Sequence, residues 1–164
     1  MAKIHLTAAL AREFFSYDAD TGLMHWRIKP CVRVDAGDRA GTLNSDGYLQ
    51  VGFKFKVYTV HRVAWLYATG EWPVGQVDHI NGVRTDNRMA NLRDVSASLN
   101  QHNRRRVARN NSSGFTGVSW VQNAWRAAIW VDGRHVFLGY FKAPEEAHAA
   151  YLEAKRRLHA GCTV

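Results

Sequence analysis

The chain has 164 residues, 46% of them hydrophobic, so it is long enough for one ordinary domain or two small ones and too apolar to be disordered throughout. Twenty-two Lys and Arg against fourteen Asp and Glu give a net charge of +8, which favours a polyanionic partner without separating DNA from RNA or an acidic membrane. Cys31 and Cys162 are the two cysteines, and they lack CxxC or Cys-His spacing, which argues against a zinc knuckle or a disulfide framework and fits a reducing cytoplasm.

The N-terminal half predicts short helices and small antiparallel sheets. Residues 6–15 predict a helix with Thr7 as N-cap. Residues 18–22 carry a hairpin signal between two apolar-aromatic runs, and strands are predicted at 48–53 and 56–60. No stretch approaches the length of a membrane span and the N-terminus does not resemble a secretory signal, so we expect a soluble cytoplasmic protein that is not secreted.

The middle of the chain predicts a helix at 61–69 that ends at Gly70. It is followed by the order strand, loop, strand, helix. The second of these strands is predicted at 91–93, and the last helix has Ser96 as its N-cap and runs to about Arg106. Asp78 and His79 lie on the first strand of this unit, Asn91 follows His79 by twelve residues, and Asn100 follows Asn91 by nine.

These residue types suit phosphodiester hydrolysis. A hard divalent cation prefers oxygen ligands, which Asp78 and Asn100 can supply, and His79 is a base able to deprotonate water. Because consecutive strand residues point to opposite faces, Asp78 and His79 can serve one site only at a strand end or a distortion.

The segment resembles the HNH nucleases, which have the ββα-metal fold, and it is closest to the homing-endonuclease branch found in phages and introns. The resemblance implies that Asp78 and Asn100 bind one cation, Mg²⁺ with Mn²⁺ as the alternative, and that His79 activates the attacking water. Asn91 would fix the loop by hydrogen bonds that orient His79. Products would carry 5′-phosphate and 3′-hydroxyl ends, and the host would be a bacterial or phage-infected cell.

The third ligand position has an alternative, and arginines flank the motif. His102 is an alternative to Asn100, but it lies about 200° further round a helix, so both cannot face one metal, and family spacing favours Asn100. Several arginines near the motif are expected to contact phosphate: Arg62, Arg104, Arg105, Arg106 and Arg109.

Residues 107–113 are polar and aperiodic, as in a linker, and a second module follows at 114–164. Three strands are predicted there, with a hairpin turn at Asp132-Gly133, and then an Ala-rich helix that starts at Pro144. The module resembles the DNA-binding domain of the plant APETALA/ethylene-response-factor family, through Gly117-Val118, Trp125, 138–141 and 145–147. By that resemblance, a set of outward residues would face DNA: Thr116, Ser119, Arg126, Trp130, His135 and Phe137. Several arginines expected at such places are replaced here, so no sequence preference is transferred.

We therefore predict an α+β protein: an HNH domain at 1–106 with its metal-site core at 76–106, preceded by small antiparallel sheet elements, and a C-terminal three-stranded antiparallel sheet packed on one helix. The predicted activity is metal-dependent nicking or cutting of double-stranded DNA, with no membrane and no obligate protein partner. A non-catalytic DNA-binding transcriptional regulator that retains the HNH scaffold is the rival. An RNA-binding factor fits the arginines and aromatics but leaves Asp78, His79 and Asn100 unexplained.

Overall fold

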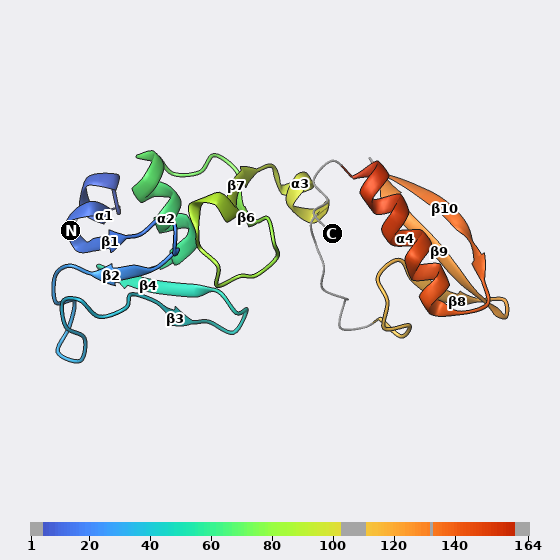
Figure 1. Ribbon diagram of the computed structural model, residues 1–164, viewed down its shortest axis with the longest axis horizontal. Coiled ribbons are helices and arrows are strands. Elements are labelled where there is room, and N and C mark those ends of the chain that lie inside the picture. Colours follow the sequence, from blue (N-terminus) through green and yellow to red (C-terminus); the bar gives the residue numbers. More distant parts are fainter. Residues whose placement is uncertain (1–4, 103–110, 132, 160–164) are drawn as a thin grey trace. The chain divides into compact units, whose positions relative to one another are not determined.

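The computed structural model describes residues 5–102, 111–131 and 133–159 (Figure 1). The chain divides into two compact units, Met1–Ser96 and Ala97–Val164. Its fold mixes helices with small antiparallel sheets, as the sequence predicts. Across the described ranges, no helix combines the length and the apolar character that crossing a bilayer requires.

The first unit opens with a helix and a hairpin. Helix α1 (Ala8–Phe14) is capped by Thr7, whose hydroxyl accepts a hydrogen bond from the amide of Leu10 at 3.3 Å, which confirms the predicted N-cap. Strands β1 (Phe15–Tyr17) and β2 (Met24–Trp26) then pair antiparallel across the predicted turn. The N-terminal residues therefore build a compact hairpin next to the helix.

A three-stranded sheet and the central helix follow. The strands are β3 (Thr42–Leu43), β4 (Leu49–Phe53) and β5 (Lys56–Thr59), in the order β3-β4-β5. Helix α2 (Val60–Thr69) ends as predicted at Gly70, which adopts the left-handed conformation with φ 88°. Its apolar face carries Val63 and Leu66, both almost fully buried in the core of this unit.

The segment that carries the motif packs on the same core. Strands β6 (Gln76–His79) and β7 (Leu92–Val95) form a two-stranded sheet, and the short 3-10 helix η1 (Met89–Asn91) leads into β7. Val77 and Leu92 belong to the core cluster that contains the buried residues of α2. This shared core holds β6 and β7 against α2.

The predicted order of strand, loop, strand and helix is found, but two boundaries differ. Asn91 closes η1, whereas the sequence placed it on the second strand. Helix α3 (Ala97–His102) is the first element of the second compact unit. The boundary between the two units therefore lies at Ser96, ten residues before the predicted end of the first domain at 106. The functional division into 1–106 and 114–164 stays a prediction, and part of the proposed linker, 107–110, lies outside the described residues.

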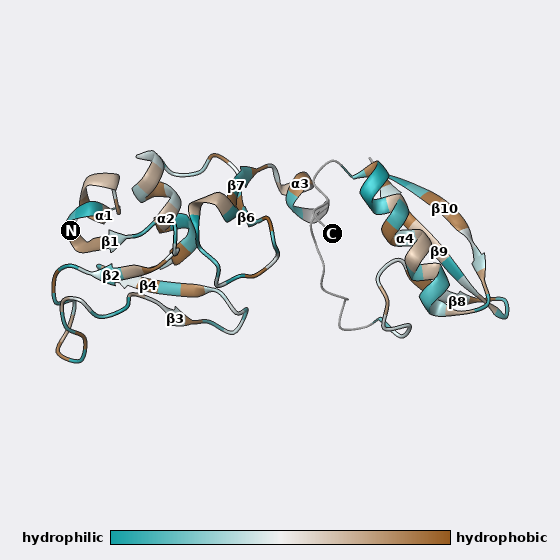
Figure 2. Ribbon diagram, viewed as in Figure 1, coloured by the Kyte–Doolittle hydropathy of each residue, from teal (hydrophilic) through white to brown (hydrophobic). Residues whose placement is uncertain are grey.

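The second unit contains a three-stranded antiparallel sheet and a helix, and α4 lies across one face of the sheet (Figure 1). Its strands are β8 (Val118–Val121), β9 (Ala124–Val131) and β10 (Arg134–Phe141), in the order β10-β9-β8, and α4 spans Pro144–Leu158. Hydrophilic and hydrophobic residues alternate along α4 (Figure 2). Ala127 and Ile129 of β9 and Ala147 of α4 are buried, so helix and sheet share an apolar core.

Candidate active site

Hydrogen bonds hold both ends of the β6–β7 pair, from a side chain at one end and between backbone groups at the other. At the entrance to β6, the Asp94 carboxylate accepts hydrogen bonds from the amides of Val74 (2.8 Å) and Gly75 (2.9 Å). At the exit, the amide of Ile80 donates to the carbonyl of Asn91 at 2.9 Å. The strand that carries Asp78 and His79 is therefore fixed at both ends.

Asn91 shapes the loop between the two strands. Its Oδ1 accepts from the amide of Asn81 at 2.9 Å, and its Nδ2 donates to the carbonyl of Asp86 at 2.8 Å. The side chain is buried, with 7% of its surface exposed. Because an amide side chain offers both a donor and an acceptor, Asn can satisfy two backbone groups of opposite kind in one buried place.

Asp78 and His79 occupy consecutive positions at the end of β6 and are both buried. The Asp78 carboxylate faces its cross-strand partner Arg93, whose Nε and Nη2 donate to Oδ2 at 3.0 and 2.8 Å. The imidazole of His79 instead meets Asn87 of the loop, with 3.1 Å between Nε2 and Oδ1. Alternation along the strand explains why these described partners lie in different places.

Asn87 is a site residue that sequence reasoning missed. It is 1% exposed, and its side chain lies against the proposed base. The sequence offered no signal, because an Asn in a polar loop is typical of turns whose amides bond their own backbone. Only the folded loop brings this amide to the imidazole.

A cluster of rings surrounds His79. Its centroid lies 5.0 Å from that of His61 on α2 and 5.9 Å from that of Tyr48, and Tyr48 lies 5.1 Å from His61. The Arg84 guanidinium lies over the Tyr48 ring, 4.8 Å from its centroid. The Tyr48 ring and the His61 imidazole thus surround the imidazole of the proposed base, which is 4% exposed.

Burial controls the charge of both histidines. Desolvation, followed by the nearby His79 and Arg62, lowers the pKa of His61 to about 3. Desolvation also lowers the pKa of His79, against the opposing effects of the Asn87 hydrogen bond and of Asp78 and Asp86. Both imidazoles are therefore neutral at pH 7, the state in which a histidine can accept a proton.

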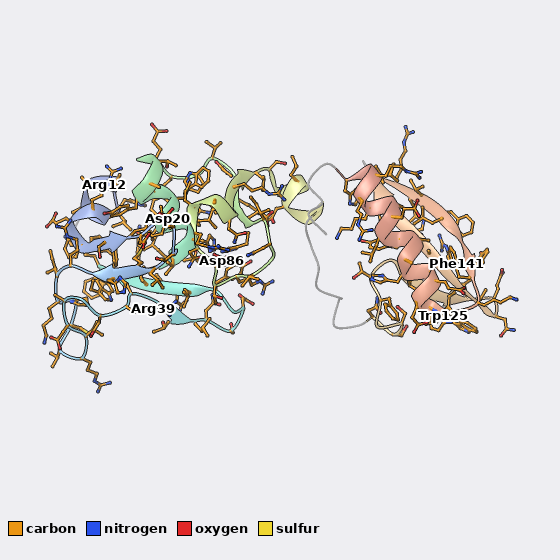
Figure 3. All side chains as sticks on the ribbon, in the orientation of Figure 1. Arg12, Asp20, Arg39, Asp86, Trp125 and Phe141 are labelled. Carbon is orange, nitrogen blue, oxygen red and sulfur yellow. The ribbon has the colours of Figure 1, made fainter. Side chains whose placement is uncertain are left out.

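Asp86 holds the outer part of the loop. Its carboxylate accepts from Arg88 Nε at 2.8 Å and Nη2 at 2.6 Å and from Asn81 Nδ2 at 2.7 Å, in the region labelled Asp86 in Figure 3. The hydrogen bond from Arg88 is the main cause that lowers the pKa of Asp86 to about 2. The Asp86 carboxylate therefore stays ionised at all physiological pH values and forms an ion pair with Arg88.

The remaining predicted residues of the motif are placed only in part. Asn100 lies on α3 in the second compact unit and Asp78 lies in the first, so their joint binding of a cation stays a prediction. Arg62 stacks over Trp72, with 5.7 Å from guanidinium carbon to ring centroid. The side chain of His102 and the predicted phosphate-binding arginines lie outside what the structure describes: Arg104, Arg105, Arg106 and Arg109.

The open face of the second unit displays aromatic and polar side chains. Trp130 is 63% exposed and Phe137 51% exposed. Trp130 pairs across the strands with His135, whose Nδ1 accepts from Arg126 Nη2 at 3.1 Å, and Ser119 pairs with Arg126. Thr116 lies in the loop before β8, where its carbonyl is 3.2 Å from His148 Nδ1 of α4.

Tyr140 also lies on this face, although strict alternation from His135 and Phe137 would place it on the opposite one. The pairing of β9 with β10 shifts between Phe137 and Gly139, and Gly139 has φ 140°. This bulge moves the alternation by one residue, so Tyr140 pairs with Arg126 and is 54% exposed. The glycine inside a strand pattern was the signal that could have revealed the bulge.

Residues 58–102 match the family model of the HNH endonucleases. No curated protein and no solved structure gives a significant match. The matched segment includes Asp78, His79, Asn91 and Asn100, and it also includes Asn87. The match supports an HNH nuclease, and with it a hydrolase that acts on DNA.

Proposed function

We propose that the protein is a metal-dependent endonuclease of the HNH homing type that nicks or cuts double-stranded DNA. The observation that carries the proposal is the buried, neutral His79 at the end of β6, with its Nε2 bonded to an amide oxygen. An amide oxygen only accepts hydrogen bonds, so the proton lies on Nε2 and the lone pair on Nδ1. That lone pair is the proton acceptor required of a base.

In this mechanism, His79 Nδ1 takes a proton from a water molecule as the oxygen of that water attacks the phosphorus. The bond between phosphorus and the 3′-oxygen breaks, and the 3′-oxygen takes a proton from solvent water to become the 3′-hydroxyl. Asn91 holds the loop by its two backbone hydrogen bonds while this happens. The low-polarity surroundings formed by Tyr48 and His61 keep the imidazole neutral before the reaction. The arginines near the motif neutralise the phosphate backbone.

The donor chemistry fits a hard divalent cation, Mg²⁺ or Mn²⁺. Asp78 would contribute a carboxylate oxygen and Asn100 an amide oxygen, and such a cation binds few protein oxygens and keeps several waters. Arg93 occupies Oδ2 of Asp78 and orients the carboxylate. When bound, the cation would stabilise negative charge on the phosphate and the leaving oxygen.

The second unit is proposed to bind the DNA on which the first unit acts. Its open face joins Arg126 and His135 to exposed Trp130 and Phe137, a combination suited to phosphates and apolar base edges. A binding surface separate from the catalytic residues would let the second unit position the first on extended duplex DNA, as expected of a site-specific enzyme.

The competing proposal is a non-catalytic DNA-binding regulator. The Asp78–Arg93 ion pair favours it, because Arg93 donates two hydrogen bonds to Oδ2 and balances the charge of the carboxylate without a metal ion. This protein would bind DNA and leave it uncut with or without Mg²⁺.

Nicking of supercoiled plasmid by the full chain, measured with and without Mg²⁺, distinguishes the endonuclease from the non-catalytic regulator. We expect Mg²⁺-dependent nicking that His79→Ala reduces by about 10²-fold to 10⁴-fold, the usual contribution of a general base. DNA binding should stay near the wild-type level. His5→Ala is the matched control, since His5 is exposed and its Nε2 lies 3.4 Å from Lys56 Nζ, with no part in the proposed chemistry. Unchanged nicking by His79→Ala would remove the base assignment, and no nicking by the wild type would favour the regulator.

A further inference from the structure

We propose that Asn87 is the positioning residue for His79, and that the N-terminal β1–β2 hairpin holds Asn87 in place. The catalytic meaning of this inference rests on the proposed function. The contacts themselves do not, so they can be tested whether or not the protein cuts DNA. The hairpin lies outside the segment 58–102 that matches the nuclease family, which makes it a separate part of the chain acting on the base.

The contact between the two side chains is well placed to orient a ring. Nε2 of His79 and Oδ1 of Asn87 are 3.1 Å apart, and the two residues are 4% and 1% exposed. A hydrogen bond in such a buried place is stronger than one in water, because little solvent competes for the donor. It fixes the rotation of the imidazole as well as the nitrogen that carries the proton.

The side chain of Asn91 bonds backbone groups and not the imidazole. Its oxygen and its nitrogen bond the backbone of Asn81 and Asp86, so its side chain shapes the loop. Asn87 projects from that loop and reaches the ring itself. Asn91 therefore stabilises the loop, and Asn87 orients the imidazole of the proposed base.

The hairpin meets the loop at the backbone of Asn87 and its neighbours. The hydroxyl of Tyr17 on β1 donates to the Asn87 carbonyl at 2.7 Å, and the amide of Met89 donates to the Ala19 carbonyl at 2.9 Å. Gly22 sits so close that an added Cβ would lie 2.6 Å from the Asn87 carbonyl carbon. Gly22 also has φ 72°, which favours glycine. The hairpin is therefore in direct contact with the residue that bonds His79.

The test compares two substitutions of similar size in the full-length protein. Asn87→Asp keeps an oxygen acceptor, and Asn87→Leu replaces it with an apolar group. In protein with ¹⁵N-labelled histidine, free of DNA and Mg²⁺, we expect a solvent-protected Nε2–H proton signal for His79, assigned by its loss in His79→Ala. The signal should persist in Asn87→Asp and disappear in Asn87→Leu.

Nicking kinetics supply the second measurement. We expect Asn87→Leu to lower kcat by about 100-fold with KM unchanged, the order of loss for a reacting group misplaced by about 1 Å. Asn87→Asp should retain a kcat well above that of Asn87→Leu. A protected signal in Asn87→Leu, or equal loss of signal and kcat in both variants, would show that Asn87 is only structural.

Tyr17→Phe tests the hairpin and also serves if Asn87→Leu does not fold. It removes the donor to the Asn87 carbonyl and should weaken both the protection of the His79 proton and kcat. Tyr67→Phe is the control, because Tyr67 packs against Tyr17 with ring centroids 5.8 Å apart. Equal behaviour of the two variants would overturn the role of the hairpin. If the wild type failed to nick DNA while the proton signals followed these expectations, the proposed function would fail and the positioning contact would stand.

Discussion

The two compact units use their polar and aromatic residues in opposite ways. In the first, His79, Asn87 and Asn91 are buried, and their side chains bond one another or the loop backbone. In the second, Trp130, Phe137 and neighbouring polar groups stand exposed on a sheet whose other face is covered by α4. A base needs a fixed, desolvated position, whereas a binding surface needs access to its partner. Substitutions made in one unit at a time therefore test the proposed base in the first unit and the proposed DNA-binding surface in the second.

The largest effect is expected from Gly117→Ala in the second unit. An added Cβ would lie 2.1 Å from the Tyr151 ring, at a residue with φ 76°. We expect a loss of several kcal/mol, since overpacking of about 1–3 kcal/mol adds to backbone strain of similar size. Thermal unfolding should show early melting of this unit, with weaker DNA binding.

Gly114→Ala is the matched control for that variant. Gly114 has φ 75°, but nothing lies within 4 Å of its added Cβ. It should therefore show the backbone strain alone. Equal destabilisation by the two substitutions would mean that the packing of Tyr151 on Gly117 does not hold the second unit together.

A somewhat smaller effect is expected from Asn91→Ala in the first unit. The substitution leaves the amide of Asn81 and the carbonyl of Asp86 without their partner, at about 1–3 kcal/mol for each group. Urea unfolding should show this loss, and nicking should fall with it because the loop carries Asn87. Wild-type stability in Asn91→Ala would contradict the role of Asn91 in shaping the loop.

Acid should destabilise the first unit through His61. Its pKa is about 3 in the folded protein against 6.5 for an unperturbed histidine, so the unfolded chain binds more protons below pH 6.5. This contribution is complete above pH 6.5 and is lost as the pH falls from 6.5 towards 3. At pH 5 the loss is on the order of 2 kcal/mol.

His61→Phe provides the comparison for acid sensitivity. It removes the titrating group and keeps a ring beside His79 and Tyr48. The dependence of the unfolding free energy on pH between 6.5 and 4 should then become flatter than in the wild type. The same slope in both proteins would show that other groups cause the acid sensitivity.

The smallest of these effects is expected at the open face of the second unit. Trp130→Ala should weaken DNA binding by about tenfold, in the range for removal of an aromatic contact residue, with no change in melting temperature. Trp120→Ala is the control, since Trp120 is also exposed but pairs across the strands with Trp125, on the opposite face of the sheet from Ser119 and Arg126. DNA affinity measured by fluorescence anisotropy should fall in Trp130→Ala and not in Trp120→Ala. An equal loss of affinity in both variants would contradict the assignment of this face to DNA binding.

Local chemistry allowed much of this structure to be predicted from the sequence. Thr7 caps α1, Gly70 ends α2, and the alternation along β9 buries Ala127 and Ile129 while exposing Trp130. Each of these features depends on neighbouring residues and on the period of a helix or strand, which the sequence contains directly. The resemblance of the motif to the HNH nucleases likewise predicted a nuclease, and the family match supports that prediction.

Only the tertiary structure revealed the contacts between distant segments. Asn87 lies in a loop that its own sequence describes only as polar, yet its amide bonds His79 while its backbone bonds Tyr17, seventy residues away along the chain. The Asp78–Arg93 pair depends on the register of β6 against β7, and the place of Tyr140 depends on a bulge. The sequence by itself determined the elements and the chemical types of the site residues. Their partners were decided by the packing of the loop, hairpin and strands, because a hydrogen bond needs correct geometry in space that residue spacing does not specify.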